Sequence, residues 1–136
     1  MHSLASSKPP DRFISVAAVV IGCLFAIWVF SIATIDGPAA LGFVLAVCAW
    51  VASPYILFAL SSLFLCSWWG SRLVLVLGVI GSAAFGLWSF SFVDEDAQGA
   101  LVLLFAPVYQ LVGAVLFVAV VAGIETAKPF LSRRHG

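Results

Sequence analysis

Charged residues are scarce in this chain of 136 residues, and their scarcity is the first constraint on what the protein is. Asp, Glu, Lys and Arg together make up 9% of the sequence, whereas they make up roughly 25% of an ordinary soluble domain. Hydrophobic residues make up 64%, and the mean hydropathy is +1.21. This composition excludes a water-soluble globular protein.

The sequence also has few residues that bind metals or carry out covalent chemistry. Its two histidines, His2 and His135, lie at opposite ends of the chain, and its three cysteines form no Cys-x-x-Cys pair. Zinc sites need several Cys or His ligands close together, and disulfide-forming membrane enzymes need paired thiols. We therefore expect no catalytic residues, no cofactor and no metal ion, and a protein that is not an enzyme.

Ionisable residues are missing from the interiors of the apolar segments. Proton-coupled transporters carry carboxylates within the membrane, and an exporter of the small multidrug-resistance type would need one in its first helix. The nearest carboxylate here is Glu125, at the end of the last apolar segment. The pattern disfavours a transporter of that type.

The sequence does contain four long apolar segments without charges, at 13–35, 37–71, 73–93 and 97–124. A bilayer core of about 30 Å needs about 20 helical residues per crossing, and a backbone in lipid must satisfy its own hydrogen bonds. The sequence therefore predicts an all-α fold, a bundle of four transmembrane helices. The lipid bilayer is its main partner, and nothing in the sequence indicates nucleic-acid binding.

The predicted membrane domain covers residues 13–126. It lies between a short flexible N-terminal segment, 1–12, and a basic C-terminal tail, 127–136. Within it we expect four helices, at about 13–35, 38–66, 72–92 and 97–125. Pro38 suits the first turn of a helix, where its missing N–H leaves no hydrogen bond unmade, and it marks the start of the second helix.

The charges are distributed unequally between the two sides of the predicted membrane. The connections on one side carry acids, Asp36 and an outer acidic loop of Asp94, Glu95 and Asp96, and no basic residue. All six basic residues fall on the other side: Lys8, Arg12, Arg72, Lys128, Arg133 and Arg134. Positive residues in short loops stay on the cytoplasmic side, so we expect both termini in the cytoplasm and the acidic connections outside.

The outer acidic loop has two interpretations. Asp94, Glu95 and Asp96 directly precede the fourth helix, where negative charge stabilises the positive end of the helix dipole. The alternative is a divalent-cation site. Adjacent carboxylates from one short loop rarely provide the six or more oxygens that calcium prefers, so the sequence favours the helix-terminus role.

Small residues recur on one face of the third helix. Gly78, Ser82 and Gly86 are four residues apart, and Ala18 and Gly22 repeat the spacing on the first helix. Small residues let helices approach closely in lipid. This helix-packing ridge holds the bundle together internally or forms the interface of a homo-oligomer or of a membrane protein partner, and internal packing is favoured.

Two prolines inside the apolar segments, Pro54 and Pro107, predict kinks in the second and fourth helices. Polar residues accompany both prolines near the middle of the membrane, and they form a candidate polar midplane cluster of Ser53, Tyr55, Tyr109 and Gln110. These side chains hydrogen-bond to one another and to the carbonyls that proline leaves free, or they line a small polar cavity. The first alternative is favoured.

Three short stretches resemble a known group of proteins. They are 96–101 (Asp-Ala-Gln-Gly-Ala-Leu), 107–110 (Pro-Val-Tyr-Gln) and 53–55 (Ser-Pro-Tyr). They are similar to segments of small uncharacterised four-helix membrane proteins of bacteria. The resemblance implies a bacterial inner-membrane protein but no activity, and it marks five positions for mutation: Asp96, Gln98, Pro107, Tyr109 and Gln110.

These observations lead to two hypotheses about function. The first is a non-enzymatic inner-membrane protein that acts through helix–helix contacts with a membrane partner. Such a protein would be a small subunit of an assembly, or an immunity-type protector against a membrane-inserting toxin. The alternative is a small oligomeric channel or carrier that uses the polar midplane cluster.

Overall fold

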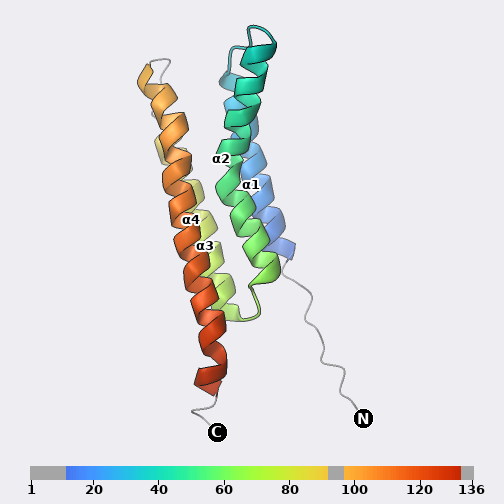
Figure 1. Ribbon diagram of the computed structural model, residues 1–136, viewed down its shortest axis with the longest axis vertical. Helices are drawn as coiled ribbons and strands as arrows, with labels where there is room; N and C mark the ends of the chain where they lie inside the picture. Colours follow the sequence, from blue (N-terminus) through green and yellow to red (C-terminus); the bar gives the residue numbers. More distant parts are fainter. Residues whose placement is uncertain (1–11, 92–96, 133–136) are drawn as a thin grey trace.

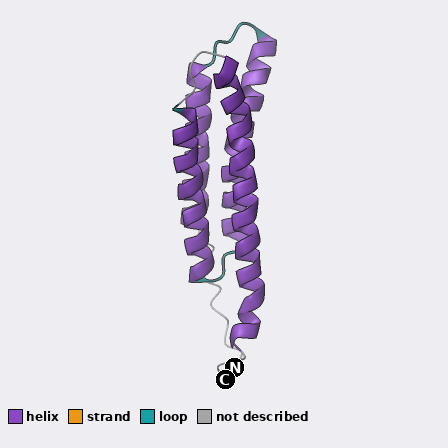
Figure 2. Cartoon of the chain, turned by 90° about the vertical axis from the view of Figure 1, so that its left-hand side faces the viewer, coloured by secondary structure: helices purple, strands orange, loops and turns teal. Residues whose placement is uncertain are grey.

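The computed structural model describes residues 12–91 and 97–132, and these residues form four helices (Figure 1). They are α1 (Arg12–Ile32), α2 (Pro38–Phe64), α3 (Trp69–Phe90) and α4 (Ala97–Ser132). Each is long and apolar enough to cross a membrane. The described residues form no strand (Figure 2). The prediction of an all-α bundle of four transmembrane helices is confirmed.

The bounds of the helices differ in places from those expected. Helices α2 and α4 begin at the expected residues, Pro38 and Ala97, but α1 ends three residues early and α3 begins three residues early, at Trp69. Arg12, expected in the N-terminal segment, is the first residue of α1. Helix α4 continues to Ser132, through the first part of the segment expected to be a basic tail. Hydropathy marks the part of a helix that lies in lipid, and polar helix-forming residues extend the helix beyond it.

The four helices pack as two hairpins, α1 against α2 and α3 against α4 (Figure 1). Helix α2 also packs against α4 and α3, and a smaller contact joins α1 to α3. Helices α2 and α3 therefore each contact all the other helices, whereas α1 and α4 do not contact each other closely. Figures 1 and 2 show an elongated bundle in which the four helices run roughly side by side.

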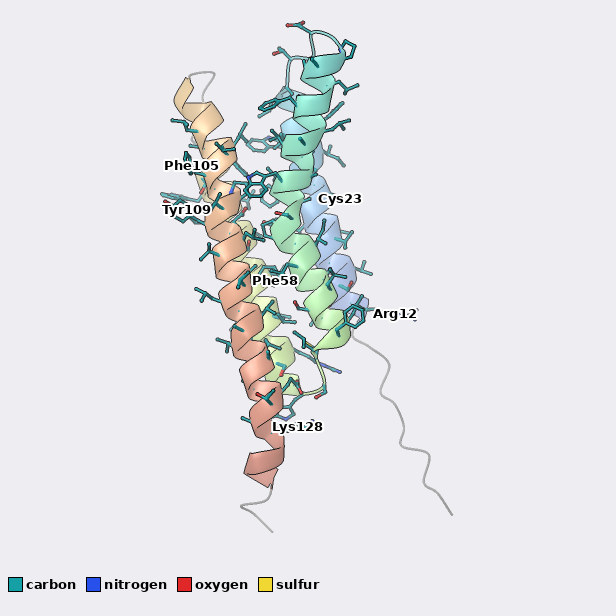
Figure 3. All side chains as sticks on the ribbon, viewed as in Figure 1. Arg12, Cys23, Phe58, Phe105, Tyr109 and Lys128 are labelled. Carbon is teal, nitrogen blue, oxygen red and sulfur yellow. The ribbon has the colours of Figure 1, made fainter. Side chains whose placement is uncertain are left out.

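The described charges separate between the two ends of the bundle. Arg12 and Lys128 lie at the end that carries the connection between α2 and α3 (Figure 3), and Arg72 lies in the first turn of α3 at the same end. Asp36 lies in the connection between α1 and α2, at the other end. The assignment of the basic end to the cytoplasm stays a prediction.

Aromatic side chains fill the space between the two hairpins. The Phe25 ring of α1 stacks on Tyr55 of α2 and meets Phe90 of α3 edge-on, in both cases with 5.6 Å between ring centroids. Helices α1 and α2 come this close because Gly22 has no side chain, since a Cβ atom there would lie 3.0 Å from Tyr55 Cβ. Towards the basic end, Phe58 of α2 lies in a second buried cluster with Leu75.

Candidate functional site

Gln110 of α4 is a polar side chain buried inside the bundle. It is 4% exposed, and its Nε2 donates hydrogen bonds to the Ser82 carbonyl of α3 at 2.8 Å and to the Tyr55 hydroxyl of α2 at 3.4 Å. One amide group therefore joins three helices. In lipid no water competes for these contacts, so Gln110 sets the rotation of α4 against α2 and α3.

The orientation of the Gln110 amide follows from its partner. A carbonyl only accepts hydrogen bonds, so the atom that faces the Ser82 carbonyl must be Nε2, and Oε1 points elsewhere. Oε1 is buried and has no hydrogen-bond partner among the described residues, and the same is true of Ser82 Oγ. Buried polar atoms are nearly always paired in folded proteins. The site therefore offers an acceptor that the rest of the bundle does not use.

Ser53 forms a hydrogen bond within its own helix. Pro54 lies inside α2 and has no N–H to give to the Trp50 carbonyl one turn earlier. Ser53 Oγ donates to that carbonyl at 2.7 Å. The serine replaces the hydrogen bond that proline removes, and α2 continues as α-helix through Pro54, as α4 does through Pro107.

Tyr109 faces away from the interior. It is 67% exposed, and Figure 3 shows it projecting from the side of α4 that is turned away from α1 and α2. The structure thus brings together two of the four residues of the candidate polar midplane cluster, Tyr55 and Gln110. Ser53 is bonded within its own helix, and Tyr109 lies on the outer surface.

Sequence reasoning missed two further hydrogen bonds between helices. Trp50 Nε1 of α2 donates to the Leu104 carbonyl of α4 at 3.1 Å, one turn before the buried Pro107. Cys48 Sγ of α2 donates to the Ala26 carbonyl of α1 at 3.3 Å. Both acceptors are backbone atoms, which a residue pattern does not reveal.

The helix-packing ridge of α3 faces inward at two of its three positions. A Cβ atom on Gly78 would lie 2.8 Å from the Phe58 ring, and one on Gly86 would lie 2.7 Å from Gln110 Nε2. Gly78 therefore makes room for the aromatic core, and Gly86 makes room for the Gln110 amide. Ser82, between them, provides the carbonyl that Gln110 binds. These contacts support the interpretation of the ridge as internal packing.

A groove of about 200 Å³ runs between α3 and α4. Its floor contains buried groups, Gln110 among them, while its rim contains exposed aromatic rings. The groove is lined by Phe58, Gly81, Gln110, Gly113 and Phe117, and the exposed rings of Phe85 and Tyr109 lie on its rim. Cβ atoms added to Gly81 and Gly113 would meet nothing within 4 Å. Unlike Gly78 and Gly86, these two glycines border open space.

A second polar site joins the ends of α3 and α4. The Glu125 carboxylate of α4 accepts hydrogen bonds from the backbone N–H groups of Ser67 and Trp68, both at 3.1 Å, and from the hydroxyls of Ser67 and Ser71. Lys128 Nζ donates to Ser67 Oγ at 3.4 Å. The N-terminal N–H groups of a helix have no partner within the helix. Glu125 therefore caps α3 from a neighbouring helix.

The outer acidic loop of Asp94, Glu95 and Asp96 lies outside the described residues. Within residues 12–91 and 97–132, no group of three or more His, Cys, Asp or Glu side chains is placed to hold a metal ion. The polar chemistry of the described part of the chain is therefore hydrogen bonding at Gln110 and at Glu125.

Comparison with known proteins identifies no relative. No protein-family model, no curated protein and no solved structure matches this chain. The function is therefore inferred from the geometry of the described residues.

Proposed function

We propose that this chain is a non-enzymatic membrane protein that acts through helix–helix contacts with a membrane partner. It would serve as a small subunit of an assembly or as an immunity-type protector against a membrane-inserting toxin. The observation that carries the proposal is the groove between α3 and α4, where Gly81 and Gly113 border open space. Close packing and interhelical hydrogen bonds are the main forces that hold helices together in lipid.

The surface of the bundle also supports a partner met within the membrane. Large apolar side chains are exposed on all four helices, for example Ile27, Phe43, Leu77 and Leu116. The described part of the chain consists of these helices and two short connections, so it offers little polar surface to a partner in water.

We propose a location in the bacterial inner membrane on the resemblance to small bacterial membrane proteins, and an orientation with both termini in the cytoplasm on the charge distribution. Three basic residues of the described chain, Arg12, Arg72 and Lys128, share one end of the bundle, and Asp36 lies at the other. Basic residues beside short membrane segments are retained on the cytoplasmic side. The orientation is proposed on this distribution.

The alternative function, a small oligomeric channel or carrier, would use Gln110 as part of a polar path. The Gln110 amide hydrogens are bonded to Ser82 and Tyr55 within the bundle, and the fully buried side chains of Tyr55 and Phe58 fill the space beside it. This packing favours a structural role for the amide over a conducting one.

Co-purification with a groove-filling variant tests the proposal. The tagged chain would be cross-linked in native membranes and purified in mild detergent as wild type, as Gly113→Leu and as Gly123→Leu. Both glycines are on α4 and border open space, but only Gly113 lines the groove. Specific partners should be retained by wild type and Gly123→Leu and lost from Gly113→Leu. The same partners with all three chains, or none with any, would contradict the proposal.

A further inference from the structure

A larger groove lies between α1 and α3, where the two hairpins make only a small contact. Its volume is about 490 Å³, which falls in the range of small-molecule sites, about 300–1,000 Å³. Its lining residues come from 21–28 of α1 and from 83–91 at the end of α3, and all of them except Ser91 are apolar. This α1–α3 groove takes no part in the function proposed above.

The α1–α3 groove opens on the outside of the bundle. Phe25 and Phe90 line it and are buried, so their rings, which meet edge-on, form its floor. Phe25 also stacks on Tyr55, which closes the groove towards α2. Leu24 and Leu87 line it and are exposed, so they form its edges. In a membrane, such a groove faces the surrounding lipid.

The α1–α3 groove extends through one leaflet of the bilayer. The first candidate membrane span is Arg12–Ile32. The deepest lining residue on α1, Ile21, is eleven residues before the end of that span, or about 16 Å at 1.5 Å per residue. Half of a bilayer core of about 30 Å is about 15 Å. The groove therefore begins near the membrane surface and ends near the midplane, whereas a transmembrane helix of a partner would follow a groove through both leaflets.

The polarity of the α1–α3 groove changes along its length. At the end nearer the membrane surface it contains the indole of Trp28 and the hydroxyl of Ser91, and at its deep end it contains Ile21 and Ala83. Tryptophan prefers the level of the headgroups, and the Trp28 N–H makes no hydrogen bond to the described residues. A phospholipid has the same order of groups, with polar esters at the surface and an apolar chain that reaches the midplane.

We propose that the α1–α3 groove binds one acyl chain of a phospholipid from the leaflet at the end of the bundle that carries Asp36. The ester groups of the lipid lie at the level of Trp28, and the chain extends over Phe25 to Ile21. Protein atoms surround a chain in the groove on several sides, so it makes more van der Waals contacts than a chain beside a convex helix. This lipid is therefore held more tightly than the other lipids around the bundle.

Counting bound lipids tests the inference. The full chain would be purified in mild detergent, dioleoylphosphatidylcholine added in steps, and the number of lipids on each chain measured by native mass spectrometry. We expect one lipid per chain to bind at concentrations at which further lipids are still replaced by detergent. Glycerophosphocholine, which has the headgroup but no acyl chains, should not displace it.

Two neighbouring alanines of α3 locate the lipid. Ala83→Leu places a larger side chain in the groove and should weaken binding of the first lipid by about 10-fold or more, because even one extra methylene in an apolar pocket can have an effect of that size. Ala84→Leu makes the same change at an exposed residue that does not line the groove. It should bind the first lipid as wild type does.

A second pair of variants on α1 gives an independent measurement. Leu24→Trp narrows the groove from its exposed edge and should weaken the first lipid, whereas Ile27→Trp changes an exposed residue outside the groove and should not. Circular dichroism checks that the helices of each variant are intact. If Ala83→Leu does not fold, the comparison of Leu24→Trp with Ile27→Trp decides.

Three results would overturn the inference. The first is that no lipid binds before the others, and the second is that the groove variants bind the first lipid as tightly as wild type. The third is a dimer of the chain that retains no lipid and is lost in Ala83→Leu, which would identify a second copy as the occupant. None of these results bears on the groove between α3 and α4, so the proposed function is tested separately.

Discussion

Two glycines of α3, three residues apart, should respond in opposite directions to replacement by alanine. A Cβ atom at Gly78 would lie 2.8 Å from the Phe58 ring and 3.1 Å from Phe117, and Phe58 is buried. A Cβ atom at Gly81 would meet nothing within 4 Å. The two variants make the same chemical change on the same helix.

The magnitudes follow from two opposing effects. Alanine in place of glycine within a helix stabilises it by about 0.5–1 kcal/mol, and both variants gain this. Overpacking a filled core costs about 1–3 kcal/mol, and only Gly78→Ala incurs this cost. From the middles of these ranges we expect Gly78→Ala to lower the free energy of unfolding by about 1 kcal/mol and Gly81→Ala to raise it by about 0.5–1 kcal/mol.

The measurement is unfolding of the purified chain in mixed micelles of increasing sodium dodecyl sulfate content, followed by circular dichroism. A Gly78→Ala chain as stable as wild type would refute the packing of Phe58 against α3. Strong destabilisation by Gly81→Ala would refute the conclusion that Gly81 borders open space on α3.

Three further predictions concern the polar groups and the orientation. Glu125→Ala removes the carboxylate that caps α3 and should lower the free energy of unfolding by about 0.5–2 kcal/mol in the same assay. Glu125→Gln keeps an acceptor and should lower the free energy of unfolding by less. Equal stability of Glu125→Ala and wild type would reject the cap. Ser53→Ala removes the hydroxyl that donates to the Trp50 carbonyl and should lower the free energy of unfolding by about 1 kcal/mol. An unchanged midpoint of the unfolding transition would count against that hydrogen bond. Reporter fusions should place both termini in the cytoplasm, and an external terminus would contradict the proposed orientation.

The number of helices was predictable because it depends only on local composition. Each crossing needs its own apolar segment, and each segment is present in the sequence. The start of α2 was predictable from Pro38, a residue with a strong positional preference. The end of α4 was not, because the segment that ends at Ser132 contains polar residues that suit both a helix and a tail.

The candidate site was only partly predictable. Tyr109 and Gln110 both lie near the middle of the membrane by their position along α4. Neighbouring side chains of a helix point about 100° apart, so only one of the two faces the interior. Which one does depends on the rotation of α4 against α2 and α3. The partner of Gln110 is the backbone carbonyl of Ser82, and no residue pattern encodes that contact.

The cap on α3 illustrates the same limit. Glu125 and Ser67 are 58 residues apart in sequence, and they meet because α3 and α4 pack with one particular register. The sequence places Glu125 at the end of its apolar segment, where contact with the lipid headgroups would be enough to solvate its carboxylate. Only the packed hairpin shows that the carboxylate accepts hydrogen bonds from the N–H groups of Ser67 and Trp68, directly before α3.

Photo-cross-linking from the rim of the groove tests most directly the claim that this chain acts through a helix-contact surface between α3 and α4. Benzoylphenylalanine would replace Phe85, an exposed residue of the rim, and be activated in native membranes with wild-type glycines, with Gly113→Leu or with Gly123→Leu. The account predicts covalent adducts with a membrane protein that Gly113→Leu abolishes and Gly123→Leu preserves. Adducts with lipid alone, or protein adducts that persist when the groove is filled, would contradict it.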